Sequence, residues 1–216
     1  MRIKAIIRRI RYELRDIIIN RKNRSRLMNN EFSIISSDCT GGCICKDLKV
    51  QMKSPTRNFY FNSNDYIKFC KNLKYYLSLS LSRDKDNNNH ELSSYLTAMC
   101  GDVRLFLVHY ESYEQAAEEW ERRKGRVNFG NLFFIMNDRN NCTEEDLDEF
   151  EKLPYKNKIC FTHIPYPDRK YTYYLPGSEK KTCVESVMKY IHPWWVKRYY
   201  DIFDYVEFLN NGNIDC

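Results

Sequence analysis

The chain has 216 residues, of which 43% are hydrophobic and 30% are charged. Such a chain suits one domain of ordinary size with a buried core, which excludes global disorder. The formal net charge is +6, but residues 1–30 hold ten basic and two acidic side chains, so the rest is slightly acidic. A general nucleic-acid-binding surface would spread over the body, so no nucleic acid is expected as a partner.

Residues 1–28 predict a basic amphipathic helix that precedes the domain. Arg and Lys fill its polar faces, and such a helix can lie on an anionic membrane surface. Alternatively, its apolar stripe packs on the domain's own core while the arginines are solvated. Both interpretations stay open. The stripe, at helical spacing, consists of Ile3, Ile6, Ile7, Ile10, Leu14, Ile17 and Ile18.

Nine cysteines are scattered along the chain without a preceding signal peptide. We therefore expect free thiols in the cytoplasm, with peripheral attachment to the inner face of the membrane as a further expectation. Cys39, Cys43 and Cys45 lack paired spacing and a second ligand cluster, so no metal site is predicted. The residues point to no particular cofactor. No apolar run reaches about eighteen residues, so no membrane-spanning helix is expected.

Residues 29–216 predict a single α/β domain that starts with a short buried strand. The strand belongs to the run FSIISSDCTGG, and it ends at a loop that contains Gly41 and Gly42. Glycine in such a loop allows a ligand to approach the backbone closely. The segment from Ser36 to Gly42 is therefore the first candidate for a working site.

Further strands and helices alternate along the rest of the chain. Nearly continuous apolar runs predict strands over residues 103–110, 131–136 and 158–162. A turn is expected at Ser54–Thr56 and a polar surface loop over residues 83–94. Alternating strands and helices argue for an α/β sheet with helices on its faces. The predicted helices begin at Asp65, after Ser112, after Thr143 and at Pro193, and their stop signals include Gly125 and Asn210.

Besides the helix that begins at Asp65, which Ser63 or Asn64 can cap, two of these helices carry recognisable capping residues. Ser112 is expected to cap the first, with Gln115 as its capping-box partner. Thr143 is expected to cap the second, in the run TEEDLDEFEKL. The acidic residues of its first turn complement the helix dipole.

Polar side chains follow every predicted strand. In open α/β sheets, ligands bind beyond the carboxyl ends of the strands. We therefore predict a shared cleft at those ends, although strands end in polar loops in all proteins. The residues at the ends of the four strands are Ser36, Ser37, Asp38 and Cys39, then His109 and Tyr110, then Asn137, Asp138 and Arg139, and finally Thr162 and His163.

His109 is the residue that we expect to transfer protons, since histidine titrates near neutral pH. Asp38 and Ser36 are expected to act with it as catalytic residues, and Asn137 and Tyr110 as substrate-binding residues. A purely structural histidine is the alternative. Cys39 would need an electropositive setting to act as a nucleophile, so we place it, with Gly41 and Gly42, among the substrate-binding residues.

The helix after Ser112 offers further substrate-binding candidates near its end, namely Trp120, Arg123 and Arg126. A guanidinium group suits phosphate or carboxylate, and an indole can stack on a sugar ring. Alternatively, the tryptophan is part of the core and the cations balance the helix dipole. Arg57, after the Ser-Pro turn, is another anion-binding candidate. Gly41 and Gly42 form neither a dinucleotide fingerprint nor a P-loop.

Several ordered motifs resemble a bacterial family known as domain of unknown function 1919. The motifs are IISSDCTGG, SPTRNFYF, DYIKFCKNLKYYL and HYESYEQAAEEWERRKGRVNFGNLFFIMNDR, followed by KNKICFTH. They cover roughly residues 30–165. The resemblance implies a three-layer α/β/α domain with a mixed, mainly parallel sheet, and an association with capsule and exopolysaccharide gene clusters. The family's loop often has an aromatic residue where this chain has Thr40.

Three functions follow as expectations from these residues and this resemblance. The first is a transferase of bacterial surface-polysaccharide synthesis that binds a sugar nucleotide or a lipid-linked sugar. The second is a non-catalytic accessory protein that docks on a membrane enzyme through residues 1–28. The third is a glycan-modifying hydrolase.

Overall fold

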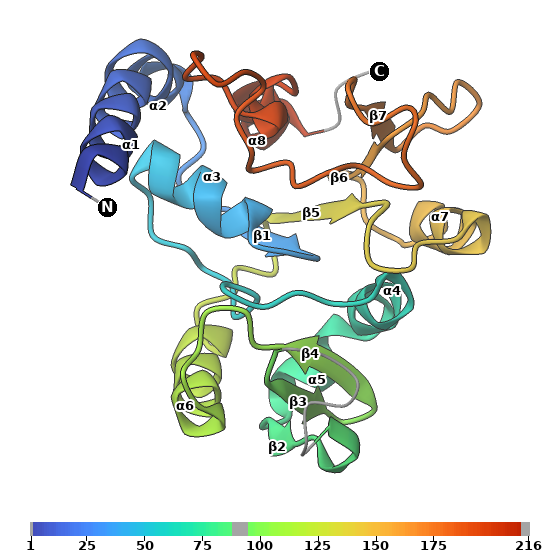
Figure 1. Cartoon of the computed structure of the whole chain (residues 1–216). Helices are drawn as coiled ribbons and strands as arrows, with labels where there is room; N and C mark the ends of the chain where they lie inside the picture. Colours follow the sequence, from blue (N-terminus) through green and yellow to red (C-terminus); the bar gives the residue numbers. More distant parts are fainter. Residues whose placement is uncertain (1, 88–94, 213–216) are drawn as a thin grey trace.

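The structure, a computed structural model, describes residues 2–87 and 95–212 (Figure 1). Its centre is a parallel sheet in the order β1-β5-β6-β7. The strands are β1 (Ser33–Ser36), β5 (Leu132–Asn137), β6 (Lys158–Thr162) and β7 (Thr172–Tyr174). The register pairs Ser33 with Leu132 and Ile135 with Ile159, so the carboxyl ends of these strands point to one edge.

Two hydrophobic clusters cover the two faces of this sheet, which gives the three layers that the sequence predicts. Because side chains alternate along a strand, Ile35 and Phe134 enter one cluster and Ile34 and Phe133 the other. The first cluster contains residues of α4 (Ser63–Lys71), α5 (Leu73–Ser78), α6 (Tyr113–Lys124) and α7 (Glu144–Glu151). The second contains residues of α3 (Thr40–Leu48) and α8 (Tyr205–Asn211).

The antiparallel strands form a separate small sheet. It consists of β2 (Ser82–Arg83), β3 (Thr97–Cys100) and β4 (Val103–Phe106). The predicted strand over residues 103–110 is therefore shorter, and it does not join the parallel sheet. Val103, Leu105 and Leu107 pack instead into the first cluster, which also contains residues of α6. The short helix η2 (Lys85–Asn87) follows β2, and most of the predicted loop at 83–94 lies outside the described residues.

Local signals in the sequence predict the helix starts after Ser112 and Thr143 correctly, whereas α4 begins at Ser63 and its N-cap is Asn62, not Ser63 or Asn64. The Ser112 hydroxyl accepts from the Gln115 backbone N–H, as predicted, but the Gln115 side chain binds the Glu111 N–H. Thr143 forms a full capping box with Asp146. The glycine loop is an exception, since α3 begins at Thr40 and takes in both glycines. A Cβ on Gly41 would lie 2.8 Å from Ile34, so this glycine allows α3 to pack closely on β1.

The C-terminal region departs most from the sequence-based expectation. Residues 193–197 are not helical, and only the short η3 (Tyr199–Asp201) and α8 follow. Tyr190 and Arg198 form an isolated bridge that closes this segment into a loop. Trp194 is 88% exposed at its tip. The predicted helix from Pro193 was therefore wrong over residues 193–204 and right only over α8, because long-range contacts fix the segment before α8.

Residues 2–26 form one helical segment, made of α1 (Arg2–Arg15), the π-helical turn η1 (Asp16–Asn20) and α2 (Arg21–Arg26). Its apolar stripe faces outward, with five isoleucines between 51% and 63% exposed. The alternative in which these residues pack on the core is therefore wrong. We call Ile6, Ile7, Ile10, Leu14, Ile17 and Ile18 the isoleucine face.

The polar side of this segment holds it on the body through a buried ion cluster. Arg15 is fully buried, and its guanidinium binds Asp47 of α3 (2.6 Å) and Asp201 of η3. It also donates to the Val196 carbonyl (2.9 Å) and to the Tyr200 hydroxyl (3.1 Å). Burial alone lowers the pKa of Arg15, but the hydrogen bond to Asp201 and the neighbouring charges outweigh it and raise the pKa overall.

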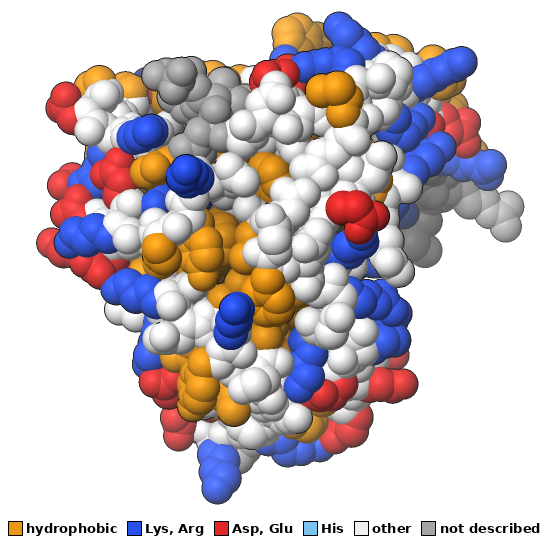
Figure 2. Space-filling model, turned by 180° about the vertical axis from the view of Figure 1, so that it is seen from behind, with side chains coloured by type: hydrophobic (Ala, Val, Ile, Leu, Met, Phe, Trp, Pro, Cys, Tyr) orange, Lys and Arg blue, Asp and Glu red, His pale blue; other side chains and the backbone are white. Residues whose placement is uncertain are grey.

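Neither a membrane span nor a metal cluster is found in residues 2–87 and 95–212. None of the helices there is both long and apolar enough to cross a bilayer. Within the same ranges, no group of three or more His, Cys, Asp or Glu side chains is arranged to hold a metal ion. The reverse side of the molecule carries interspersed acidic and basic side chains around an exposed hydrophobic area (Figure 2).

Candidate functional site at the carboxyl edge of the parallel sheet

The carboxyl ends of β1 and β5 bring three of the predicted site residues together. The Asp38 carboxylate accepts from Asn137 Nδ2 at 3.0 Å and from the Thr40 backbone N–H at 2.9 Å. The Ser36 hydroxyl lies 3.5 Å from the same carboxylate and accepts from the Gly41 N–H at 3.3 Å. All these side chains are buried, so the group forms a closed polar cluster at the sheet edge.

A second carboxylate, Asp138, joins the ends of β5 and β6. Its Oδ2 accepts from the His163 backbone N–H at 2.7 Å and lies 2.5 Å from His163 Nδ1. Its Oδ1 accepts from the Val184 N–H at 2.7 Å. With Nδ1 as the proton donor, the carboxylate orients the imidazole and leaves Nε2 as an acceptor. His163 follows a strand in the sequence, as His109 does, but only the tertiary structure pairs it with a carboxylate.

Next to Asp138 lies a cavity of about 470 Å³, which we call the edge pocket. Its cationic lining comes from Arg139, Lys180, Lys181 and Lys189. In the described part of the chain, only Lys189 of these forms an ion pair, with Glu185 at 2.7 Å. The Val184 segment that lines the pocket is the one that binds Asp138. The excess of positive charge makes this pocket suited to a phosphate or another anion.

His109 follows β4, which belongs to the separate antiparallel sheet and not to the parallel one. It is exposed in a turn, and among the described residues no hydrogen bond or ion pair joins it to Asp38, whose carboxylate binds Ser36, Thr40 and Asn137. The predicted pairing of these two residues therefore has no support from the geometry. Strands of different sheets do not share a carboxyl edge, although sequence periodicity cannot tell them apart.

Tyr110, Arg57 and Arg123 form a group of their own. The Tyr110 hydroxyl donates to the Arg57 carbonyl at 3.0 Å and accepts from Arg123 Nη1 at 2.8 Å. A Cβ on Gly42 would lie 3.5 Å from the Arg57 side chain, so this group borders the start of α3. Arg123 is buried and also pairs with Glu119. These contacts give it a structural role in holding α6 against the Arg57 loop.

Trp120 and Arg126 do not reach the carboxyl edge. Trp120 is fully buried, and its Nε1 donates to the Leu79 carbonyl at 3.0 Å. It is a core residue, so the predicted stacking on a sugar ring is wrong. Arg126 is half-buried in the turn after α6. Its backbone N–H donates to the Arg123 carbonyl at 3.0 Å.

Cys39 is a poor nucleophile in this setting. Burial, together with the charge of Asp38, raises the pKa of its thiol to about 12. We expect iodoacetamide at neutral pH to modify Cys39 roughly a thousandfold more slowly than a free cysteine, because the thiolate is nearly absent. Mass spectrometry of the alkylated protein measures this rate, and the denatured chain serves as the control. Alkylation of the folded protein at the rate of a free cysteine would contradict this placement.

Two comparisons with known proteins agree with this architecture. The family described as domain of unknown function (DUF1919) matches residues 10–210. An uncharacterized protein of Haemophilus influenzae is 36% identical over 194 residues, which cover 90% of this chain and 91% of that protein. The family match extends beyond residues 30–165, so it includes Arg15, the edge pocket and all of α8 but its last residue. The chain therefore belongs to the DUF1919 family.

Proposed function

We propose that this protein is a transferase of bacterial surface-polysaccharide synthesis that acts on a phosphate-linked sugar at the inner face of the membrane. The observation that carries the proposal is the edge pocket, where three cations have no ion pair among the described residues and Val184 of the lining hydrogen-bonds to Asp138, the partner of His163. A parallel α/β sheet most often binds its ligand at this edge. The outward-facing isoleucine face supports a peripheral membrane position.

The residues divide into binding and catalytic roles. Arg139, Lys180 and Lys181 bind the phosphate that links the sugar to a nucleotide or a lipid. His163 Nε2 takes the proton of the acceptor hydroxyl, whose oxygen bonds to the anomeric carbon. The bond between that carbon and the phosphate oxygen breaks, and the phosphate leaves with its negative charge held by the cations. Asp138 positions the imidazole.

Calorimetry with a panel of nucleoside-diphosphate sugars, and with a lipid-linked sugar diphosphate in detergent, tests the binding step. We expect Lys180→Ala/Lys181→Ala to weaken binding at least about tenfold, since two charge-assisted contacts are lost. The matched control is Lys22→Ala/Lys197→Ala, which removes two lysines from a different cavity. The proposal fails if no compound binds, or if both double variants lose the same affinity.

His163→Ala tests the transfer step separately. Because general-base catalysis typically contributes about 100-fold or more, this variant should keep its ligand affinity and lose at least that factor in transfer rate. His109→Ala is the control, since this residue is exposed in a turn of the other sheet. An unchanged rate in His163→Ala would remove this residue from the mechanism.

The accessory-protein function has one observation in its favour, the exposed isoleucine face. It predicts that His163→Ala leaves polysaccharide output intact in cells, while deletion of residues 1–26 abolishes it. The transferase predicts loss of output in both strains.

A further inference from the structure

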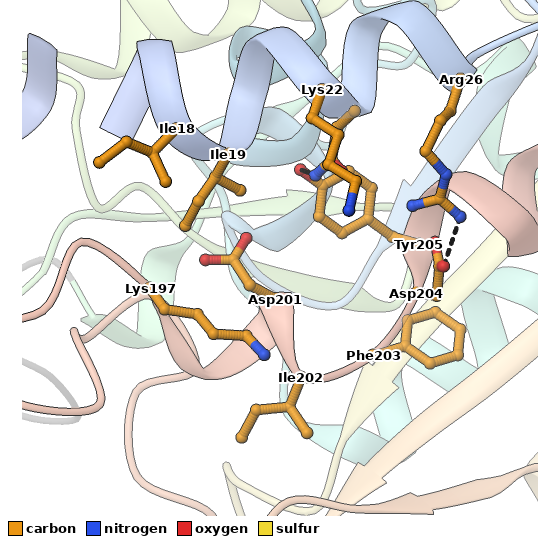
Figure 3. A pocket seen from close by; sticks show the side chains of 11 residues that line it. Ile18, Ile19, Lys22, Arg26, Lys197, Asp201, Ile202, Phe203, Asp204 and Tyr205 are labelled. Atoms are coloured by element: carbon orange, nitrogen blue, oxygen red, sulfur yellow. Dashed lines mark hydrogen bonds and ion pairs between the residues drawn. The ribbon is translucent and has the colours of Figure 1, made fainter. Parts of the chain in front are cut away.

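A second cavity lies between the N-terminal helical segment and the C-terminal segment, and we call it the helix pocket (Figure 3). Its volume is about 340 Å³, and it shares no lining residue with the edge pocket. Lys22 extends toward it from α2, and Lys197 from the loop before η3 (Figure 3). Apolar atoms of Ile18 and Ile202 complete opposite sides.

The charges of the helix pocket leave two cations free for a ligand. Asp201 is held by Arg15, and Asp204 by Arg26, so both acidic residues of the lining are neutralised. In the described part of the chain, neither Lys22 nor Lys197 takes part in an ion pair. Two ammonium groups from separate segments therefore face one cavity, an arrangement that favours a phosphate.

The mouth of this pocket borders a surface that is suited to lipid. Ile18 lines the pocket and is also 58% exposed on the isoleucine face. Trp194 and Trp195 are exposed on the neighbouring loop, which Arg11 of α1 holds through the Trp195 carbonyl at 2.7 Å. Tryptophan is enriched at membrane interfaces because its ring is amphipathic. Hydrophobic and basic side chains lie together at the corner where the N-terminal helices stand, at the upper right of Figure 2.

We infer that the helix pocket binds the phosphate of an anionic phospholipid headgroup. The isoleucine face and the Trp194–Trp195 loop enter the outer part of the same leaflet. This inference rests on the proposed membrane position, but it concerns a site separate from the edge pocket. An isolated amphipathic helix would respond only to the density of negative charge. A built cavity also recognises a single lipid molecule, because Lys22 and Lys197 converge on one headgroup.

Flotation of the full chain with vesicles of phosphatidylcholine, with and without phosphatidylglycerol, tests the inference. We expect binding only to the anionic vesicles, and a loss of about thirtyfold in Lys22→Ala/Lys197→Ala. The matched control, Lys180→Ala/Lys181→Ala, removes the same charge from the edge pocket and should bind the vesicles almost normally. Equal losses in the two double variants would overturn the inference in favour of diffuse attraction.

Titration with a short-chain phosphatidylglycerol below its micelle concentration removes the membrane surface from the experiment. As the lipid is added, the change in tryptophan fluorescence should reach a plateau for the unchanged protein and for Lys180→Ala/Lys181→Ala. It should reach no plateau over the same range for Lys22→Ala/Lys197→Ala. Inorganic phosphate should not compete at equal concentration, and full competition would show a free-anion site instead. Sugar-nucleotide affinity is measured on the same variants, so failure of the lipid site and failure of the proposed transferase give different results.

Discussion

Arg15→Ala is expected to lower the free energy of unfolding by about 3–5 kcal/mol. The guanidinium is fully buried between the Asp47 and Asp201 carboxylates. Its removal leaves two buried negative charges without their main partner. Burial of unpaired charge is one of the largest destabilising effects that a single substitution produces. Urea denaturation followed by circular dichroism measures the change.

Two further variants make this expectation specific. Arg9→Ala breaks an exposed pair with Glu13, so the free energy of unfolding should stay nearly unchanged. The triple variant Arg15→Met, Asp47→Asn, Asp201→Asn should recover part of the loss, because it removes the stranded carboxylates together with the arginine. If Arg15→Ala were as stable as Arg9→Ala, the buried cluster would not hold the N-terminal segment on the body.

Ile10→Asp/Ile17→Asp is expected to reduce binding to anionic vesicles by about 100-fold or more. Both side chains are more than half exposed on the isoleucine face, so the fold does not depend on them. Transfer of an isoleucine from water to lipid contributes about 1.5–3 kcal/mol when it is complete, and aspartate adds repulsion from anionic lipid. Vesicle flotation gives the ratio of bound to free protein.

Tyr75→Asp is the matched control, because Tyr75 is exposed to a similar degree on α5, far along the chain. This control should float with the vesicles as the unchanged protein does, and both variants should unfold at the same urea concentration. Vesicle binding that survives in Ile10→Asp/Ile17→Asp would mean that the isoleucine face contacts something other than lipid.

Local sequence patterns were sufficient to predict three strands of the parallel sheet, namely β1, β5 and β6. Each is a short apolar run bounded by polar or glycine-containing segments, and burial on both faces requires that composition. The caps at Ser112 and Thr143 were equally predictable, because a cap satisfies backbone groups within three residues.

The pairing of side chains at the carboxyl edge of the sheet could be predicted from the sequence only in part. The Asp38–Asn137 contact follows from the general rule that parallel strands end together, and the structure contains it. The same rule gave a wrong result for His109, because the prediction placed the strand before it in the parallel sheet, whereas β4 belongs to the antiparallel one. Asp138 and His163 each follow a predicted strand, but only the fold shows that β5 and β6 are neighbours and that these two side chains pair. The lysines at positions 180, 181 and 189 lie well beyond the last predicted strand, so only the fold brings them to this edge.

The sequence by itself determined the α/β class, the positions in the chain of β1, β5 and β6, and the basic, amphipathic character of the first helix. These depend on periodicity and capping, which act over a few residues. The tertiary structure alone decided that Arg15 is buried, that the isoleucine face turns outward and that Lys22 meets Lys197 across a cavity. Those outcomes depend on where the C-terminal segment packs. Contacts between residues as distant in sequence as Arg15 and Asp201, which lie 186 positions apart, produce no periodic pattern in the sequence.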